Sequence, residues 1–481
     1  MSKLYAAIDL GASSGRVIAG SICDASVNLF EVHRFANTPI ERGKSLYWDF
    51  ESLKIEVAQG LRLLGDFAQR EGHSVASIGV DTWAVDYGLI DDAGNLIDGV
   101  RSYRDERNLF GVALVDQVIS FEDLYRENGI QFLQFNTIYQ LAAEQSQSPE
   151  ALNRANKLLM VPDLLNYWLT GVAVSERTNA STTGLLSLES HGWNWSLIEL
   201  LGIRAGMFPD LVSPGEVIGN LLDGFKTNSA FSETVVIATP SHDTAAAVAG
   251  TPLLGESDAY LSSGTWSLLG LELNEAITST EARLENFTNE QGAENRVRFL
   301  KNLSGLWLLQ QSMLEFEKND PAISLQKLLQ DAALVESDAR IEVTDSEFAT
   351  PGDMPAKIQT ACARRGNAVP QSPAQIVRCI LDSLADAYAK ALKSLERVTG
   401  IRVKSIYIVG GGSQNDLLSQ LTADSTGVKV WAGPVEATAL GNILCQAGAQ
   451  GFAPKNLDAQ RQLIRANFSP KVFTPKLLGT K

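Results

Sequence analysis

The sequence predicts an α/β protein with more than one domain, and three observations carry this. Val235–Val248 begins as a β-branched run, turns at Pro240 and continues as an alanine-rich stretch, a pattern of strand, tight turn and helix. Tyr5–Gly20 and Ala259–Gly270 each predict two strands joined by a turn of small residues. The chain has 481 residues, which is too long for one hydrophobic core, so we expect two or three domains.

The composition is that of an ordinary globular protein, with 45% hydrophobic and 20% charged residues. A formal net charge of -16 argues against a nucleic acid or an anionic membrane as partner. No apolar run approaches the roughly 20 residues that span a bilayer, and the first residues lack a secretory signal pattern. We therefore expect a cytoplasmic protein, monomeric or homodimeric, that acts on small molecules.

The chain has four cysteines and four histidines, and they form no CxxC or Cys/His cluster of the kind that binds zinc. Reduced thiols are the expectation for a cytoplasmic protein. Cys362 and Cys379 are the only cysteines close in sequence, so a disulfide between them stays open as an alternative.

The first predicted hairpin has a turn, Gly11–Gly15, without bulky side chains, so phosphate groups of a ligand could approach its backbone amides. It is not a Walker loop, because no Gly-Lys-Ser/Thr follows, and the alternative is an ordinary hairpin turn. Asp9 is unusual, because a carboxylate that closes an apolar strand needs a partner or a metal ion.

The rest of the first half alternates helices and strands. The apolar spacing predicts a helix over residues 53–70, a strand that ends at Asp81 and another that runs from Val85 into a turn. Helices are expected to begin at Asn136 or Thr137 and near Pro162, and residues 179–183 are expected to form a polar turn. Residues 128–136 mix aromatic and amide side chains, which suits a sugar and suits a domain core nearly as well.

Asp243 follows the predicted strand of Val235–Val248, at the position where open α/β sheets form their crevices. A carboxylate there could act as a catalytic base. The alternative is structural, because Asp243 or Ser241 could cap the helix by accepting a backbone N–H.

The second half repeats the hairpin pattern at Ala259–Gly270, which suggests a duplicated unit that begins near residue 250. The polar stretch 319–370 is expected to be irregular and peripheral, and residues 374–396 to be helical. A strand then breaks into Gly410–Gly412 before a helix near Asn415. Three glycines could lie flat against a nucleoside, or could form an ordinary turn capped by Asn415. Residues 434–441 are expected to open the last major helix.

The order of these parts resembles the superfold shared by sugar kinases, Hsc70 and actin, and within it the FGGY carbohydrate kinases. The resemblance runs nearly end to end and rests on eight ordered motifs: Asp9–Arg16, Ser77–Asp86, Ile130–Leu141, Ser241–Thr244, Leu261–Ser267, Lys301–Gln310, Val409–Gly412 and Ala432–Ala437.

This resemblance implies two ribonuclease-H-like (actin-like ATPase) domains with a nucleotide cleft between them, an N-terminal domain over residues 1–248 and a C-terminal domain over 249–481. It implies an enzyme that uses ATP and Mg²⁺ to phosphorylate a ketose. The 1-hydroxyl of L-rhamnulose is the expected acceptor, with L-fuculose or a pentulose as the alternatives, because a few side chains decide which hydroxyl configuration is accepted.

Carried onto this sequence, the resemblance gives each motif a role. Asp243 is the expected general base and Asp9 is expected near Mg²⁺, through water. The expected ATP-binding residues are Ala12, Ser13, Ser14, Gly15, Arg16, Thr265, Gln310 and Gly411. The expected sugar-binding residues are Ala84, His242, Asp243, Thr244 and Asn302.

Two of these positions carry qualifications. Ala84 stands where relatives often have glycine, so the wall of the sugar pocket should move slightly inward. Arg16 could bind a phosphate, but an ion pair is the alternative for an arginine on a hairpin.

A non-catalytic sugar sensor and an actin-like assembly protein are the rival functions. A sensor of the repressor type would need a DNA-binding motif and a basic surface, and the chain is acidic. Asp243 and both small-residue turns are present, which favours an enzyme.

Overall fold

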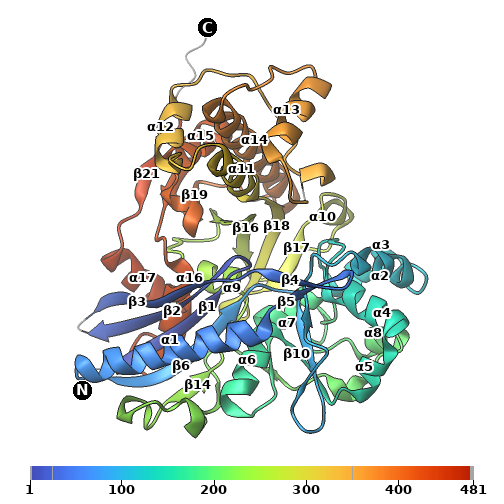
Figure 1. Cartoon of the computed structure of the whole chain (residues 1–481), viewed down its shortest axis with the longest axis vertical. Helices are drawn as coiled ribbons and strands as arrows, with labels where there is room; N and C mark the ends of the chain where they lie inside the picture. The colour runs from blue at the N-terminus through green and yellow to red at the C-terminus, as the bar shows by residue number, and fades with distance from the viewer. Residues whose placement is uncertain (1–2, 24, 349, 477–481) are drawn as a thin grey trace. The chain divides into compact units, whose positions relative to one another are not determined.

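The computed structural model describes residues 3–23, 25–348 and 350–476, which form two compact units (Figure 1). Unit 1 comprises the described residues up to Pro252, Glu272–Phe299 and Ala437–Asn467. Unit 2 comprises Leu253–Leu271, the described residues of Leu300–Glu436 and those from Phe468 to Lys476. The units thus interleave along the sequence, and the domain division at residues 248 and 249 stays a prediction.

Unit 1 is built on a six-stranded sheet with the order β13-β14-β6-β1-β2-β3. β1 pairs antiparallel with β2 and parallel with β6, and β6 pairs parallel with β14. The carboxyl ends of β1, β6 and β14 therefore meet at one edge of the sheet. The strands are β1 (Lys3–Leu10), β2 (Ser14–Cys23), β3 (Ser26–Ala36), β6 (Ser74–Thr82), β13 (Val217–Asn220) and β14 (Val235–Ile237).

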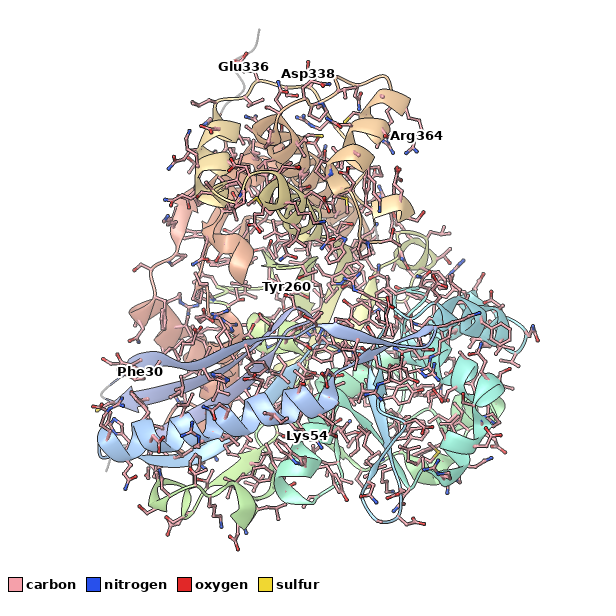
Figure 2. The ribbon with its side chains drawn as sticks, viewed as in Figure 1. Phe30, Lys54, Tyr260, Glu336, Asp338 and Arg364 are labelled. Carbon is pink, nitrogen blue, oxygen red and sulfur yellow. The ribbon has the colours of Figure 1, made fainter. Side chains whose placement is uncertain are left out.

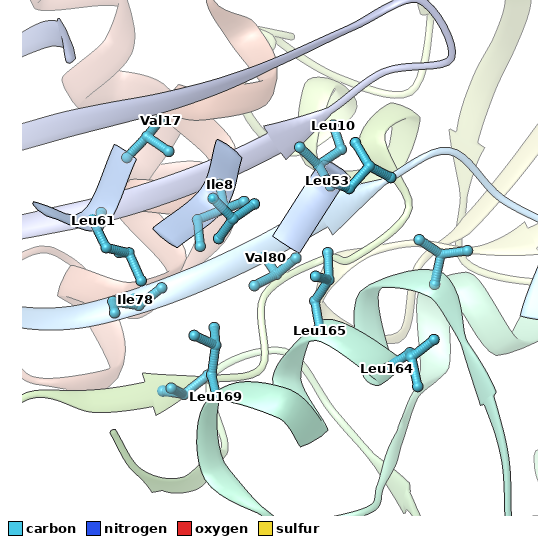
Figure 3. Packing of buried hydrophobic residues seen from close by; sticks show 14 of the residues in the cluster. Ile8, Leu10, Val17, Leu53, Leu61, Ile78, Val80, Leu164, Leu165 and Leu169 are labelled. Carbon is cyan, nitrogen blue, oxygen red and sulfur yellow. The ribbon is translucent and has the colours of Figure 1, made fainter. Parts of the chain in front are cut away.

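Helices cover both faces of this sheet, as its continuous apolar strands predict. α1 (Phe50–Arg70) runs along one face in Figure 1. Figure 3 shows Leu53 of α1 near Leu10 of the sheet and Leu61 of α1 near Val17, in the same core as α6 (Val161–Thr170). On β1, alternate residues point to the other face, where Tyr5 packs with α16 (Ala437–Ala449).

Smaller elements of unit 1 surround the sheet. Its remaining strands are β4 (Pro39–Arg42), β5 (Ser45–Trp48), β7 (Tyr87–Ile90), β8 (Leu96–Ile97), β9 (Val100–Arg101), β10 (Lys157–Met160), β11 (Ser175–Glu176), β12 (Leu211–Val212) and β17 (Thr288–Gln291). Its remaining helices are α2 (Arg107–Val115), α3 (Phe121–Asn128), α4 (Thr137–Gln147), α5 (Pro149–Arg154), α7 (Arg177–Ala180), α8 (Trp195–Leu200), α9 (Asp243–Ala249), α10 (Thr280–Leu284) and α17 (Leu457–Asn467).

Helix starts in unit 1 were predictable, but one turn was not. The prediction that a helix begins at Asn136 or Thr137 is confirmed, since Thr137 is the first residue of α4. The prediction of a polar turn over residues 179–183 is wrong, because α7 and a 3-10 helix, Ser181–Thr183, occupy this stretch. Its Ser and Thr hydroxyls bond back to carbonyls three residues earlier, which satisfies them inside a buried helix.

Unit 2 contains a second sheet, in which β15 pairs antiparallel with β16 and parallel with β19. β20 pairs parallel with β19 and antiparallel with β21. Its strands are β15 (Asp258–Ser263), β16 (Trp266–Leu273), β19 (Ser405–Val409), β20 (Lys429–Ala432) and β21 (Lys471–Phe473), and β18 (Val297–Ser304) runs from unit 1 into unit 2. Its helices are α11 (Trp307–Asn319), α12 (Leu325–Ala333), α13 (Met354–Arg364), α14 (Pro373–Thr399) and α15 (Asp416–Thr426).

The stretch 319–370 is more ordered than its polar sequence predicts. It contains α12 and α13, which pack on α14 and bury Leu328 and Ile358, so the prediction of an irregular segment is wrong. Polar residues dominate because the outer faces meet solvent, where Figure 2 shows Glu336 and Arg364. The helical spacing of a few apolar residues among many charges was the missed signal.

Cys362 of α13 and Cys379 of α14 are free thiols in the structure, with sulfur atoms 3.8 Å apart. Burial raises the pKa of both thiols.

In the described part of the chain, no helix is long and apolar enough to cross a membrane.

Two glycines set how closely α9 and α16 approach. A Cβ added at Gly441 would lie 2.0 Å from the carbonyl oxygen of Ala246, and one added at Gly250 would lie 1.9 Å from that of Ala437. Backbone atoms cannot give way as a flexible side chain can, so the helices must separate if either glycine is replaced.

Gly441→Ala is therefore expected to destabilise the protein by about 1–3 kcal/mol, the usual cost of overpacking. Equilibrium urea unfolding measures this. Gly206→Ala is the matched control, because nothing lies within 4 Å of a Cβ there. Equal midpoints for the Gly441→Ala variant and the parent would contradict the close helix contact.

Candidate active site

Three aspartates meet at the carboxyl edge of the unit 1 sheet. Asp9 lies near the end of β1 and Asp81 near the end of β6, and the two are directly opposite in the parallel register. A bridge between Thr82 and His242 places the turn that carries Asp243 beside the same edge. Residues that are far apart in sequence thus form one acidic cluster, because parallel strands end at a common edge.

The three carboxyl groups differ in their access to solvent. Asp81 is fully buried and accepts a hydrogen bond from Asn442 Nδ2 at 2.6 Å, while its Oδ1 has no partner among the described residues. The side chain of Asp9 is 7% exposed and that of Asp243 is 32% exposed. Of the three, only Asp243 is open enough to touch a substrate hydroxyl.

Burial and the charge of Asp9 raise the pKa of both Asp81 and Asp243. Burial raises the pKa of Asp81 well above its usual range, and the charge of Asp9 adds to this. Burial also raises the pKa of Asp243, His242 lowers it, and Asp9 raises it again. Removing charge-bearing groups from water disfavours their ionised forms, and neighbouring carboxylates reinforce the effect.

The turn before α9 is not held by a side-chain cap. The helix begins at Asp243, and His242 occupies the cap position without a capping hydrogen bond from its side chain. Asp243 Oδ1 accepts the backbone N–H of Thr244 at 2.5 Å, and Ser241 Oγ donates to Glu176 instead. Neither Ser241 nor Asp243 therefore occupies the cap position of α9, although Asp243 does accept a backbone N–H.

Glu176 holds the turn in place, and sequence reasoning missed it. It lies at the end of β11, is fully buried, and accepts hydrogen bonds from the backbone N–H and the hydroxyl of Ser241, at 3.0 and 2.6 Å. It also accepts from Thr178 and from the backbone N–H of Asn179. The sequence offered little signal, because Glu176 lies between Ser175 and Arg177, like many exposed acids.

Ala84 lies in a loop fixed by a second buried acid. Asp86 accepts hydrogen bonds from the indole N–H groups of Trp48 and Trp83, at 2.6 and 3.0 Å, and from Gln140 Nε2 at 3.0 Å. Burial raises the pKa of Asp86 to about 6 despite these donors. Val85 has a φ of 67°, a left-handed conformation that such a network must hold.

The first hairpin presents its turn as expected. Gly11 N–H donates to Ser14 O at 2.8 Å, and Asn37 donates to Gly11 O and Ser13 O, which fixes the loop over Ala12–Ser14. Ser13 is exposed and Gly15 is buried against Phe35. Arg16 forms an ion pair with Asp9, which is directly opposite it in the hairpin. An ion pair was the alternative to phosphate binding for this arginine, and it is the arrangement observed.

Unit 2 brings the expected nucleotide residues near one another. Thr265 is in the turn between β15 and β16, and its Oγ1 donates to Gln310 Oε1 at 3.4 Å. A Cβ added at Gly412 would lie 2.0 Å from Ser263 Oγ, so the glycine turn packs on the end of the same hairpin. Nothing lies within 4 Å of a Cβ at Gly411, which leaves that position open. Asn302 lies on β18 within unit 2.

The carboxyl oxygens at the carboxyl edge of the sheet suit Mg²⁺, because carboxylates are hard donors. Asp81 Oδ1 is a buried oxygen without a hydrogen-bond partner among the described residues. Within residues 3–23, 25–348 and 350–476, no group of three or more His, Cys, Asp or Glu side chains is arranged to hold a metal ion. Water or substrate oxygens would have to complete the coordination shell of an ion bound here.

Comparison with solved structures identifies the architecture as that of two-domain sugar kinases. The crystal structure of ligand-bound xylulose kinase from Lactobacillus acidophilus matches with a TM-score of 0.79, at 14% identity, over 98% of this chain and 94% of that one.

Models of the FGGY family of carbohydrate kinases match residues 4–250 with the N-terminal domain and 259–449 with the C-terminal domain. The chain belongs to the FGGY family of carbohydrate kinases and is a sugar phosphotransferase. Rhamnulokinase of Enterococcus faecalis is 41% identical over 98% of this chain and 94% of its own length. Rhamnulokinase of Bacillus subtilis is 38% identical over 98% of this chain and 96% of its own length.

Proposed function

We propose that this kinase transfers the γ-phosphate of ATP to the 1-hydroxyl of L-rhamnulose, forming L-rhamnulose 1-phosphate and ADP in L-rhamnose catabolism. Identity near 40% to rhamnulokinases over nearly the whole chain supports the choice of sugar. The observation that carries the chemistry is Asp243, the open carboxylate at a sheet edge where Asp9 and Asp81 are shielded.

Asp243 acts as the general base in this proposal. Its carboxylate accepts a hydrogen bond from the 1-hydroxyl and takes the proton as the bond from oxygen to the γ-phosphorus forms and the bond to the ADP oxygen breaks. His242 and Thr244 flank it and orient the ketose, together with Ala84 and Asn302. Because phosphoryl transfer has a loose transition state, alignment contributes more than basicity.

The phosphate groups of ATP bind to exposed backbone amides and hydroxyls. In unit 1 these come from Ala12–Gly15, and Arg16 either stays with Asp9 or turns to the phosphates. In unit 2 they come from Thr265 and Gln310, with Gly411 on the nucleoside side. Mg²⁺ would be held near Asp9 through water, with Asp81 Oδ1, a buried oxygen without a hydrogen-bond partner among the described residues, as a further candidate ligand, and it would neutralise phosphate charge.

Sugar choice is tested with a panel of ketoses. With ATP and Mg²⁺ present and ADP release as the readout, L-rhamnulose should give the highest kcat/KM, ahead of L-fuculose and pentuloses. A site that pairs with particular hydroxyls discriminates by roughly 10²-fold or more. Turnover of L-rhamnulose no faster than that of xylulose or glycerol would contradict the proposed substrate and leave the kinase assignment standing.

A further inference from the structure

A buried arginine and glutamate lie directly behind His242 and take no part in the mechanism above. Glu290 is on β17 and Arg298 is on β18, in the part of that strand that belongs to unit 1. Arg298 is fully buried and Glu290 is 5% exposed, so neither can touch a bound sugar. Arg298 Nη2 is 3.0 Å from His242 Nδ1 and 3.0 Å from Glu290 Oε2.

The direction of the Arg298 hydrogen bond decides the proton position on the imidazole. A guanidinium only donates, so a hydrogen bond from Arg298 Nη2 requires Nδ1 of His242 to be an acceptor without a proton. Glu290 Oε2 lies 3.3 Å from Nδ1, farther from that nitrogen than Arg298 Nη2 at 3.0 Å. The N–H of Arg298 thus points to the imidazole while its charge is balanced by Glu290.

The other ring nitrogen faces the catalytic carboxylate. With Nδ1 as acceptor, the proton of a neutral imidazole is on Nε2, which lies 3.4 Å from Asp243 Oδ1. The Nε2–H is then available to Asp243 or to an oxygen of the substrate. A ring with its proton on Nδ1 would offer neither of them a donor.

We infer that Arg298 is a positioning residue, which holds His242 as the tautomer with its proton on Nε2 and so directs a donor toward Asp243 and the bound ketose. The part of this inference that concerns the ketose rests on the proposed function. The part that concerns the tautomer is a property of the protein without substrate.

The tautomer is measured by NMR of the full chain with ¹⁵N-labelled histidine. The sequence has four histidines, and His242→Gln assigns the resonance of His242 by its loss. We expect the two-bond correlation pattern of a ring protonated at Nε2. A pattern with the proton on Nδ1, donated to Glu290, would overturn the inference.

Substitution of the arginine gives the second measurement. In Arg298→Met, Nδ1 loses its donor and the tautomer should shift toward Nδ1–H, with Glu290 as acceptor. Arg461→Met is the matched control, because Arg461 is a buried arginine paired with Glu272 in the same unit. It removes an equivalent ion pair and should leave the His242 tautomer unchanged. An equal shift of the His242 tautomer in both variants would show that Arg298 has only a general structural role.

Kinetics separate positioning from folding. In folded Arg298→Met, KM for the ketose should rise about tenfold, the cost of one hydrogen bond, while KM for ATP changes by less than about twofold. Arg298→Lys should recover part of the loss, because it restores a charged donor. An unchanged ketose KM in folded Arg298→Met would overturn the link to the sugar. If no ketose is phosphorylated at all, the proposed function fails while the tautomer measurement still decides the role of Arg298.

Discussion

Asp243→Asn is expected to lower kcat by roughly 10²-fold or more, because the amide cannot take the proton of the acceptor hydroxyl. Asparagine preserves the size of the side chain and an oxygen that can accept the N–H of Thr244, so the fold should persist. Steady-state kinetics with L-rhamnulose measure the loss, and ATP binding by calorimetry should be unchanged. Turnover close to that of the parent would remove Asp243 from the role of base.

Asp49→Asn is the matched control for this substitution. Asp49 precedes α1 and accepts the N–H of Ser52 at 3.2 Å, as a helix cap does. Asparagine caps helices nearly as well, so activity and stability should both stay near those of the parent. A comparable loss of activity in both variants would mean that the effect of Asp243→Asn is structural.

The pH dependence of kcat/KM is an independent test of the role of Asp243 as the base. The base must be ionised, and burial raises the pKa of Asp243 above its usual value of 3.8. kcat/KM for the ketose should therefore fall, as pH is lowered, at a higher pH than an ordinary aspartate would give. Asp243 binds its proton more readily in the folded state, so its contribution to stability is present at low pH and is lost as pH rises through its folded pKa. Loss of activity on acidification thus cannot be unfolding caused by this group.

Glu176→Leu is expected to destabilise the protein by about 3–5 kcal/mol and to lower activity as well. The substitution leaves buried donors of Ser241, Thr178 and Asn179 without their acceptor, and each unsatisfied group costs about 1–3 kcal/mol. The Ser241 turn directly precedes Asp243, so its loss should displace the base. Urea unfolding and ketose kinetics measure the two effects.

Glu396→Leu is the control for loss of a structural carboxylate outside unit 1. Glu396 accepts the N–H of Val403 at 2.9 Å near the end of α14, so its removal should reduce stability with little effect on kcat. Glu176→Leu should affect both. An active, stable Glu176→Leu variant would show that the turn before α9 holds its shape without the glutamate.

Local patterns in the sequence were sufficient for most elements. The β-branched run before Pro240, the small-residue turns at Gly11–Gly15 and Gly264, and the cap at Asn415 all form the predicted structures. Each of these depends on neighbours within a few residues, where side-chain periodicity and backbone preferences act directly. The order of the motifs then predicted the two-domain sugar-kinase fold, which the comparisons confirm.

The partners of the site residues were not predictable in the same way. Ser241 is anchored by Glu176, 65 positions earlier, and Asp81 is held by Asn442, 361 positions later. Arg298 reaches His242 from another strand, 56 positions away. A single sequence carries no pattern for such pairs, because they arise only when separate elements pack and a buried polar group must find an acceptor or donor.

The sequence by itself determined that Asp243 follows a strand and opens a helix, with small-residue hairpin turns before and after it. The tertiary structure determined how reactive the carboxylate at that position is. Register between β1 and β6 brings Asp9 and Asp81 together, burial raises the pKa of Asp243, and Asp243 alone of the three carboxylates stays open. Solvent exposure and the charges around a group depend on the whole packed chain, and these set the reactivity of a carboxylate.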